Sequence, residues 1–493
     1  MYRHSMKKKY VRWTLWTIAS PFILFVILCI LIYLPPIQNF LVDKAAVYAS
    51  EATGMNISVG RISLSFPLNL VVTDVDAASP HNDTLLSVRR LQVNVQLLPL
   101  LKKQVEVDGI SLQGATVNSN DLIHGMKLNG TLGELFISSH GVALDPETAI
   151  VNKVLLKDTD LSLCLNDTAA VDTAASDTTY WKIILQDIDL QNVSFALDMP
   201  LDSLSLAASL DNAILRDGLI DLHKSAYSLQ TFRIKNGRVR YDSGKPLAAD
   251  SLPSGLDPSH IALTDIGVKL DSLYYEGRNM KAIISQFVLK ERSGVEIVSA
   301  TGRMVSNDKV LRVPSLKLET RDSYLELNAA MDWNALDFKG EGLVSARLMA
   351  DIGKPDVVRF MGRMDEKFVR QYPSEPLRIR TGIDGDLNKL KLTTLTAELP
   401  GALGLFARGE LTHLTDSLLR GGDITLEAET KDLKFVSTLA EGIEIPYGTR
   451  LEGKFTMAGA KMGTDLLLMQ PEAQAVVAAD TIPITVYNDS ISV

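Results

Sequence analysis

A period-two alternation of apolar and polar residues runs through most of this chain and limits what it can fold into. It is clear where Ile62, Leu64 and Phe66 are separated by serines, and it recurs up to about Ala428. A strand with this pattern has one dry face and one wet face. Sheets that are dry on one side are mostly antiparallel. The sequence therefore predicts a mainly β protein with a mostly antiparallel sheet and a few short helices.

An apolar run near the amino terminus predicts a membrane anchor. Residues 13–34 carry no charged side chain and follow a tip, residues 1–12, with five lysines and arginines. At 1.5 Å per residue the run spans roughly 33 Å, enough to cross a hydrocarbon core of about 30 Å. The basic tip predicts a cytoplasmic amino terminus and an exported body. The alternative is a cleaved signal peptide, but its apolar region would be only about 7 to 15 residues long.

Residues 35–53 show a second, amphipathic helical pattern. Pro35 and Pro36 end the first helix, and the apolar residues that follow, as far as Ala52, fall on one helical stripe. A short helix that caps the start of a sheet and an interfacial membrane helix both fit this pattern. Gly54 is expected to end the helix as a C-terminal cap.

Composition excludes several classes of function. A net charge of -9 over 493 residues gives no basic surface for nucleic acid. Cys29 lies in the apolar run, so Cys164 has no internal partner for a disulfide or a thiolate zinc site. The seven histidines are dispersed, and no nucleophile elbow, P-loop, dinucleotide fingerprint or zinc-protease motif is present. We expect no enzyme activity, no metal and no cofactor.

Two carboxylate pairs, Asp158 with Asp160 and Asp187 with Asp189, are spaced to share one strand face. Such pairs can perform acid–base chemistry. The wet face of an alternating strand explains them better, because it needs no cleft. We therefore interpret them as surface residues.

Local signals predict turns, loops and one further helix. Hairpin turns are expected at Asp-Gly and Asn-Gly pairs, namely Asp108-Gly109, Asn129-Gly130, Asp217-Gly218 and Asn236-Gly237. Low-complexity stretches at 166–179 and 245–259 predict exposed loops. Apolar residues at helical spacing between Pro355 and Tyr372 predict one helix. This interruption, assigned to residues 351–372, either covers the dry face of the sheet or marks a domain boundary.

The dry face must be covered, because soluble proteins rarely expose more than a few hundred Å² of continuous apolar surface. A second sheet or lipid chains held by a curled sheet would each cover it. The chain exceeds the length that one core normally serves, and together with the anchor this favours a lipid conduit. The residues expected to line its groove are Val93, Val95, Leu97, Ile188, Leu190, Phe195, Leu316, Leu318, Leu325, Leu327, Ile424 and Leu426.

Weak self-similarity indicates a repeat architecture. The segments that begin at Val313 and Leu392 share a strand, tight turn, strand layout, and shorter echoes begin at Val107, Leu155 and Ile184. Such repeats favour a quasi-one-dimensional fold in which each unit contacts only its neighbours.

An ordered set of segments resembles a known family. The basic tip and apolar run are followed by Leu34-Pro35-Pro36-Ile37-Gln38, the amphipathic helix, ISVGRISLSFPLNLVVTDV from Ile57 and RLQVNVQLLPLL from Arg90. This order resembles the amino-terminal region of the TamB group in the AsmA-like superfamily. The segments YPSEPLRIRTGIDGDL from Tyr372 and IPYGTRLEGKFTMAGA from Ile445 are similar to the repeats of that group.

The resemblance implies a single-pass inner-membrane protein of a diderm bacterium with a periplasmic body, an elongated and curled β-groove. It implies movement of phospholipids between the inner and outer membranes, without enzymatic chemistry. The implied partners are phospholipid acyl chains, the inner membrane and an outer-membrane barrel protein of the TamA or BamA type, through a carboxy-terminal region that this chain lacks. Relatives continue beyond the point equivalent to Val493, so we expect an amino-terminal piece.

The expected organisation places a groove between residues 54 and 350 and continuing β-repeats at 373–493, on either side of the helical interruption. The alternative function is assembly or translocation of outer-membrane proteins, for which an exposed strand would pair with a client by β-augmentation. A third class, an enzyme acting on envelope polysaccharide, would need a carboxylate pair in a cleft.

Overall fold

The computed structural model describes most of the chain between residues 44 and 469 and two short strands beyond it. Inside that span the described residues are interrupted at 45, 48–49, 52, 66–68, 80–82, 97–106, 120–124, 144–146, 167–179, 245–254, 338–341, 363, 440–446, 449 and 459–460. The basic tip and the expected anchor at 13–34 lie outside the described residues. The chain divides into two units, Met1–Leu201 and Asp202–Val493.

Helical backbone precedes the sheet of the first unit. Residues 44, 46–47, 50–51 and 53 are helical. Gly54 follows with φ 69°, and its N–H donates to the carbonyl of Ser50 at 2.9 Å, which is the geometry of a left-handed C-terminal cap. The expected cap is therefore present. No helix in the described part of the chain combines the length and apolar character that a membrane crossing requires.

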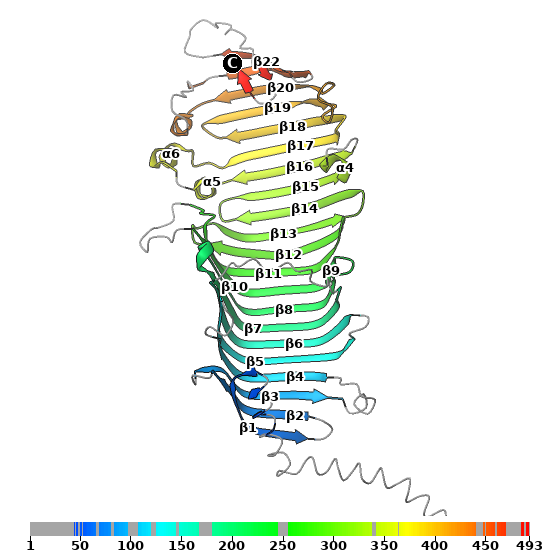
Figure 1. Ribbon diagram of the computed structural model, residues 1–493. Coiled ribbons are helices and arrows are strands. Elements are labelled where there is room, and N and C mark those ends of the chain that lie inside the picture. The colour runs from blue at the N-terminus through cyan, green and yellow to red at the C-terminus, as the bar shows by residue number, and fades with distance from the viewer. Residues whose placement is uncertain are drawn as a thin grey trace, which may run out of the picture. The chain divides into compact units, whose positions relative to one another are not determined.

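Seven strands form the sheet of the first unit (Figure 1). They are β1 Asn56–Ser65, β2 Asn69–Ala78, β3 Thr84–Val95, β4 Val107–Asn118, β5 Met126–Ala143, β6 Thr148–Leu165 and β7 Lys182–Met199. Neighbours from β1 to β6 are antiparallel, as the alternation predicts. The exception is β7, which runs parallel to β6 and so starts at the same end of the sheet.

The second unit continues as an antiparallel meander after the short 3-10 helix η1 Pro200–Asp202. Its strands are β8 Leu204–Asp221, β9 Ala226–Leu229, β10 Thr231–Ser243, β11 His260–Glu276, β12 Asn279–Glu291, β13 Glu296–Ser306, β14 Val310–Thr320, β15 Tyr324–Asp332, β16 Leu343–Ile352, β17 Leu377–Asp386, β18 Lys389–Leu399, β19 Leu403–Thr412, β20 Gly421–Thr430, β21 Arg450–Ala458, β22 Lys461–Met469, β23 Thr485–Tyr487 and β24 Ser490–Ser492. β9 and β10 both pair with β8, one after the other, and are separated by Gln230. The segments from Val313 and Leu392, expected to share one layout, form the hairpins β14–β15 and β18–β19.

The four expected hairpin turns are wrong. Asp108-Gly109 lies in β4, Asn129-Gly130 in β5, Asp217-Gly218 in β8 and Asn236-Gly237 in β10. Asp217 and Asn236 do adopt positive φ, 50° and 52°, but they do so within strands. Residues that tolerate left-handed backbone suit a kink inside a strand as well as a turn between strands, which explains the error.

The single helix expected between Pro355 and Tyr372 is also wrong. Two helices are present, α5 Lys354–Met361 and α6 Glu366–Gln371. Gly362 ends α5 with φ 74°, and the Asp365 side chain caps α6 by accepting from the N–H of Lys367. A third short helix, α4 Trp333–Leu336, follows β15, and a 3-10 helix, η2 Lys434–Thr438, follows β20.

Within each unit the sheet is one layer thick where it is described. The extensive contacts of every described strand, apart from those of β15 with α4, are with its hydrogen-bonded neighbours. The two coverings considered from the sequence were a second sheet and lipid. No second sheet packs on the first among the described residues of either unit.

Candidate functional site

Apolar side chains form transverse rows across strands β14–β20 of the second unit. Cross-strand partners share a face, so the register identifies each row. One row consists of Leu316, Leu327, Leu348, Thr381, Leu395, Ala407 and Leu426. The next consists of Leu318, Leu325, Ala350, Ile379, Ala397, Leu405 and Ala428. Two further rows start at Val313 and Leu311, and Ile424 ends the first of these.

The first unit has the same arrangement. One row runs through Leu64, Leu70, Val93, Ile110, Ile137, Val154 and Ile188, and the next through Ile62, Val72, Leu91, Leu112, Leu135, Leu156 and Leu190. Phe195 belongs to a parallel row with Leu161, Val117 and Leu86. Apolar residues that are far apart in sequence are thus brought into register on one face.

A line of special residues crosses the first unit between these rows, and we call it the phase line. It consists of Gly60, Asp74, Arg89, Gly114, Gly133, Asp158 and Asn192, which lie opposite one another from β1 to β7, each between two flanking pairs of the ladder. Asp74, Gly114, Asp158 and Asn192 have φ between 49° and 61°. On each strand, the residues that point to the apolar face are at even positions on one side of this line and at odd positions on the other. In β6, for example, Leu156 is followed on that face by Thr159 and Leu161.

The phase line bends the sheet. Two successive residues of each strand, such as Lys157 and Asp158, point away from the apolar face, and this turns the strand toward that face. Figure 1 shows the resulting curvature of β4 to β7. The Asn192 amide donates to the Asp158 carboxylate at 2.9 Å. Asp158 and Asp160 are both exposed, so the interpretation of this pair as surface residues is supported.

In the second unit, β-bulges make the same switch between odd and even apolar positions along a strand. Pro314 and Ser315 of β14 face the single residue Asn328, whose side-chain oxygen accepts from the N–H of Ser315 at 2.8 Å. Thr393 is an extra residue of β18, and its hydroxyl donates to the carbonyl of Gly382 at 2.8 Å. Each bulge switches the parity of the apolar positions, as a one-residue insertion must.

The face opposite the apolar rows carries ion pairs between strands. In the second unit Lys317 pairs with Glu326 at 3.9 Å, Lys389 with Glu410 at 3.0 Å and Lys454 with Asp423 at 3.2 Å. A hydrogen bond from the hydroxyl of Tyr324 to Glu326 raises the pKa of that tyrosine. Charge is therefore concentrated on one face, which leaves the other face apolar.

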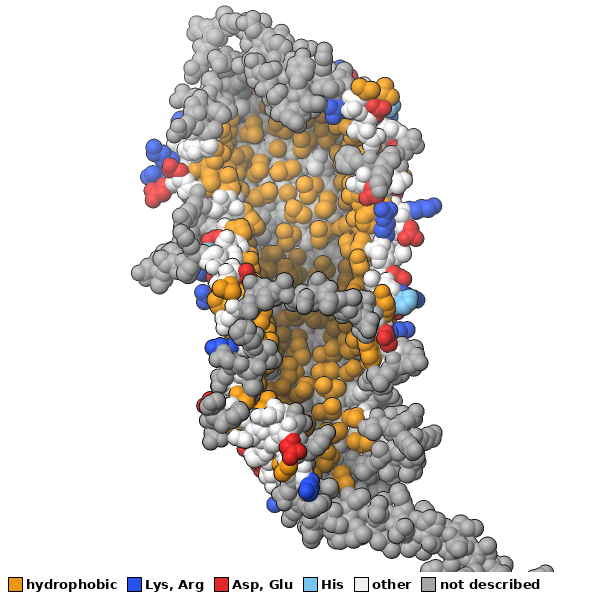
Figure 2. All heavy atoms as spheres, viewed as in Figure 1, with side chains coloured by type: hydrophobic (Ala, Val, Ile, Leu, Met, Phe, Trp, Pro, Cys, Tyr) orange, Lys and Arg blue, Asp and Glu red, His pale blue; other side chains and the backbone are white. Residues whose placement is uncertain are grey.

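The apolar face is hollowed and large in each unit. Figure 2 shows hydrophobic side chains gathered in the hollow of each unit and charged side chains at its margins. With strands about 4.8 Å apart and same-face positions about 6.8 Å apart, four rows of seven residues on β14–β20 cover about 900 Å². This area exceeds the few hundred Å² that soluble proteins commonly expose. The face is therefore the candidate functional site of this chain.

One margin of this face in the second unit is closed by a cluster that includes α6, η2 and the β18–β19 hairpin. We call it the first margin cluster; its buried members are Phe368, Tyr372, Leu399, Ala402, Leu433 and Phe435. The rings of Phe368, Tyr372 and Phe435 lie 5.1 to 5.8 Å apart, and burial raises the pKa of Tyr372. The helix α6 thus packs against the ends of β17 to β19 at this margin of the apolar face.

The helix α5 is tied to the same margin by a buried carboxylate. Asp356 is 1% exposed and accepts hydrogen bonds from the hydroxyls of Ser323, at 2.6 Å, and Thr320. Arg359 approaches it at 3.1 Å and also pairs with Asp322 at 2.9 Å. A buried charge needs such partners, so α5 is fixed to the β14–β15 turn.

The opposite margin is closed by the second margin cluster, which consists of Ala335 of α4, Val344 and Leu387. Met331, Ile383 and Leu390 from the apolar rows pack against it. The helix α4 is held in place from outside the cluster by Trp333, whose indole N–H donates to the carbonyl of Asn307 at 2.7 Å.

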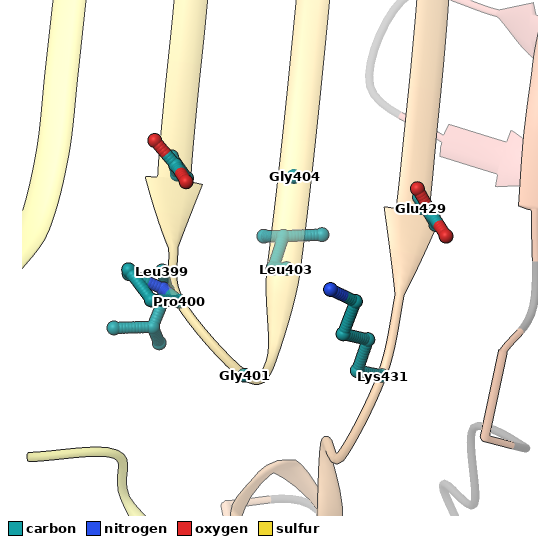
Figure 3. Close-up of a pocket in the computed structure, with 8 residues that line it drawn as sticks. Leu399, Pro400, Gly401, Leu403, Gly404, Glu429 and Lys431 are labelled. Atoms are coloured by element: carbon teal, nitrogen blue, oxygen red, sulfur yellow. The ribbon is translucent and has the colours of Figure 1, made fainter. Parts of the chain in front are cut away.

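A shallow pocket of ≈ 250 Å³ lies at the β18–β19 turn (Figure 3). It is formed where Gly404, which has no side chain, lies between Glu398 and Glu429 of the neighbouring strands. Glu398 is paired with Arg378 at 3.7 Å. No group of three His, Cys, Asp or Glu residues in the described part of the chain is arranged to hold a metal ion. The apolar face is therefore a better candidate site than this pocket.

The structure brings together, within each unit, the groove residues expected from the sequence. Leu316, Leu318, Leu325, Leu327, Ile424 and Leu426 occupy three neighbouring rows of the second unit. Val93, Val95, Ile188, Leu190 and Phe195 share the apolar face of the first unit, with Phe195 across the phase line. Leu97 lies outside the described residues.

Sequence reasoning missed many members of the rows, such as Ile110, Ile137, Leu348 and Ala407. It also missed the phase line, although a signal was present. The echoes that begin at Val107, Leu155 and Ile184 each contain an apolar residue followed by a polar residue and then Gly, Asp or Asn. The Gly, Asp or Asn is Gly114, Asp158 or Asn192. The similarity between these segments therefore reflects the switch between odd and even apolar positions, which recurs on each strand.

Comparisons with known proteins gave no match to a family model, to a curated protein or to a solved structure.

Proposed function

We propose that this chain is a membrane-anchored, non-enzymatic conductor of phospholipids, whose acyl chains lie on the apolar face of the curved sheet. The observation that carries the proposal is the apolar face of about 900 Å² over β14–β20, together with the matching apolar rows of the first unit. The resemblance to the TamB group supports the same function. It also supports an inner-membrane anchor at residues 13–34 and a periplasmic body, and both are part of the proposal.

The energetics fit a passive conductor. Each methylene kept out of water is worth about 0.8 kcal/mol, so exposing one sixteen-carbon chain would cost roughly 13 kcal/mol. A continuous row of leucines such as Leu316, Leu327 and Leu348 offers the chain an apolar surface at every step. Such a surface lowers the barrier without a covalent reaction, which is consistent with the expectation that the chain is not an enzyme.

Photo-crosslinking tests the proposal at adjacent residues of one strand. Leu327 lies on the apolar face of β15 and Glu326 on the opposite face, and Leu348 and Arg347 form a second such pair on β16. A photoreactive amino acid is placed at each position of the full chain in phospholipid-containing membranes. We expect lipid adducts, read by mass spectrometry, at Leu327 and Leu348 and at least tenfold fewer at Glu326 and Arg347.

Equal labelling of the two faces would overturn the proposal, because it would mean that lipid contacts the chain without regard to the rows. Adducts with unfolded outer-membrane protein at the apolar positions, in place of lipid, would favour the alternative role in outer-membrane protein assembly.

A further inference from the structure

The apolar face of the second unit narrows at β17. Of the side chains that β17 gives to this face, Leu377 packs against the first margin cluster and Ile383 packs against the second. Ile379 and Thr381 remain between the clusters. Two same-face positions correspond to a strip about 14 Å wide along the strand.

The face is much wider at β11. Its register with β9 and β10 places seven residues on the apolar face, from Ile261 to Tyr275. None of them belongs to either margin cluster. Seven same-face positions correspond to a strip about 48 Å wide along the strand. Among the residues that the structure describes, the part of this face left between the margin clusters therefore contracts roughly threefold from β11 to β17.

The two margins at β17 are firmly held. Phe368 and Ala402 of the first margin cluster are 1% and 0% exposed, and the ion pairs of Arg359 fix α5 beside it. On the other margin, Arg278 lies over the ring of Trp333 at 5.1 Å and pairs with Asp337 at 2.9 Å. Widening the strip would require disruption of one of these buried or paired groups.

We infer that Ile379 and Thr381 form the neck of the lipid path, the place in the second unit where passage of acyl chains is limited. This inference rests on the proposed function. Thr381 is the one hydroxyl residue in its row, between Leu348 and Leu395. A larger side chain at this position would project into the strip rather than into a packed core, so it would obstruct the path and leave the sheet intact.

The test measures the order in which lipid arrives on the two sides of the neck. Photoreactive residues are placed at Leu263 of β11 and Leu426 of β20 in the full chain. The protein in vesicles is mixed with vesicles of an alkyne-tagged two-chain phospholipid and illuminated at successive times. The delay is the interval between lipid capture at the first of these two sites to be labelled and capture at the second. We expect Thr381→Trp to lengthen this delay at least tenfold.

Two control variants are matched to this change. Thr381→Val keeps the size and branching of the side chain, and Lys391→Trp adds the same indole to the opposite, charged face of the neighbouring strand β18, outside the strip. Both should change the delay by less than twofold. Amide hydrogen exchange of β16 to β18 should be the same in Thr381→Trp as in the unsubstituted chain.

A second format keeps the test valid if Thr381→Trp does not fold. In a chain with Cys29 and Cys164 replaced by serine, Thr381→Cys is modified with a bulky thiol reagent after folding, and arrival is compared before and after modification. An unchanged delay, or simultaneous labelling of Leu263 and Leu426 in the unmodified chain, would overturn the neck. Absence of lipid adducts at both sites in the unsubstituted chain would instead overturn the proposed function.

Discussion

An aspartate placed on the apolar face distinguishes an open surface from a closed core. Leu327 and Leu399 both belong to the apolar face of the second unit, but Leu327 is partly exposed within its row, between Leu316 and Leu348. Leu399 is 4% exposed and is a buried member of the first margin cluster. The substitutions Leu327→Asp and Leu399→Asp are therefore chemically identical changes in two different environments.

The structure gives different magnitudes for the two changes. At Leu327 the new carboxylate remains hydrated, and the loss is that of cross-strand contacts with Leu316 and Leu348, about 1–2 kcal/mol in total. At Leu399 the loss of a buried leucine alone costs about 2–5 kcal/mol. An unpaired carboxylate adds several kcal/mol, so we expect about 5 kcal/mol or more.

Native-state amide hydrogen exchange is the suitable assay, because a repeat-like sheet need not unfold in one step. We expect protection of β15 amides in Leu327→Asp to fall roughly 5- to 30-fold. Protection of β18 and α6 amides in Leu399→Asp should fall more than about 1,000-fold. Equal and severe losses in the two variants would refute the reasoning, since they would show that Leu327 is enclosed as tightly as Leu399.

Three further predictions follow from particular contacts. Phe368→Ala should cost about 3–5 kcal/mol, seen as lost amide protection in α6 and η2 but not in β14; a uniform loss over the unit would contradict it. Gly409→Val should abolish soluble expression because a Cβ would lie 2.1 Å from the carbonyl oxygen of Asp423, whereas Gly404→Val should be tolerated because nothing lies within 4 Å. Burial raises the pKa of Tyr372, so folding favours the neutral phenol, and the stability gained is intact below pH 10 and lost as the pH rises further. Absorbance titration against Tyr372→Phe should show phenolate formation above pH 10, and titration at the ordinary pKa would count against burial.

The alternation predicted which face of a strand is apolar because side chains of a strand alternate whatever its partners are. Leu316 and Leu318 were therefore assigned correctly to one face. The rows themselves could not be predicted, because the pairing of Ala407 with Leu426 or of Val154 with Ile188 depends on register between strands. Register is set by contacts along the whole ladder, not by the local pattern.

The errors have a common physical origin. Asp217-Gly218 and Asn236-Gly237 were expected to turn the chain because Asp, Asn and Gly adopt left-handed backbone at low cost. The same property lets a strand switch its apolar side chains from odd to even positions without ending. Local sequence does not distinguish a turn between strands from such a switch inside a strand. Gly362, likewise, ends α5 where helical spacing of apolar residues continued.

The phase line also changes how substitutions in this sheet should be interpreted. Its members, from Gly60 to Asn192, are separated by 14 or more residues along the chain and yet each faces the next. A bulky β-branched residue at Asp158 would disturb Gly133 and Asn192 before it disturbed most residues nearby in sequence. Tolerance to mutation should therefore be correlated between residues that face one another across neighbouring strands. A change that compensates for a defect in one strand is to be sought at the facing position of the adjoining strand.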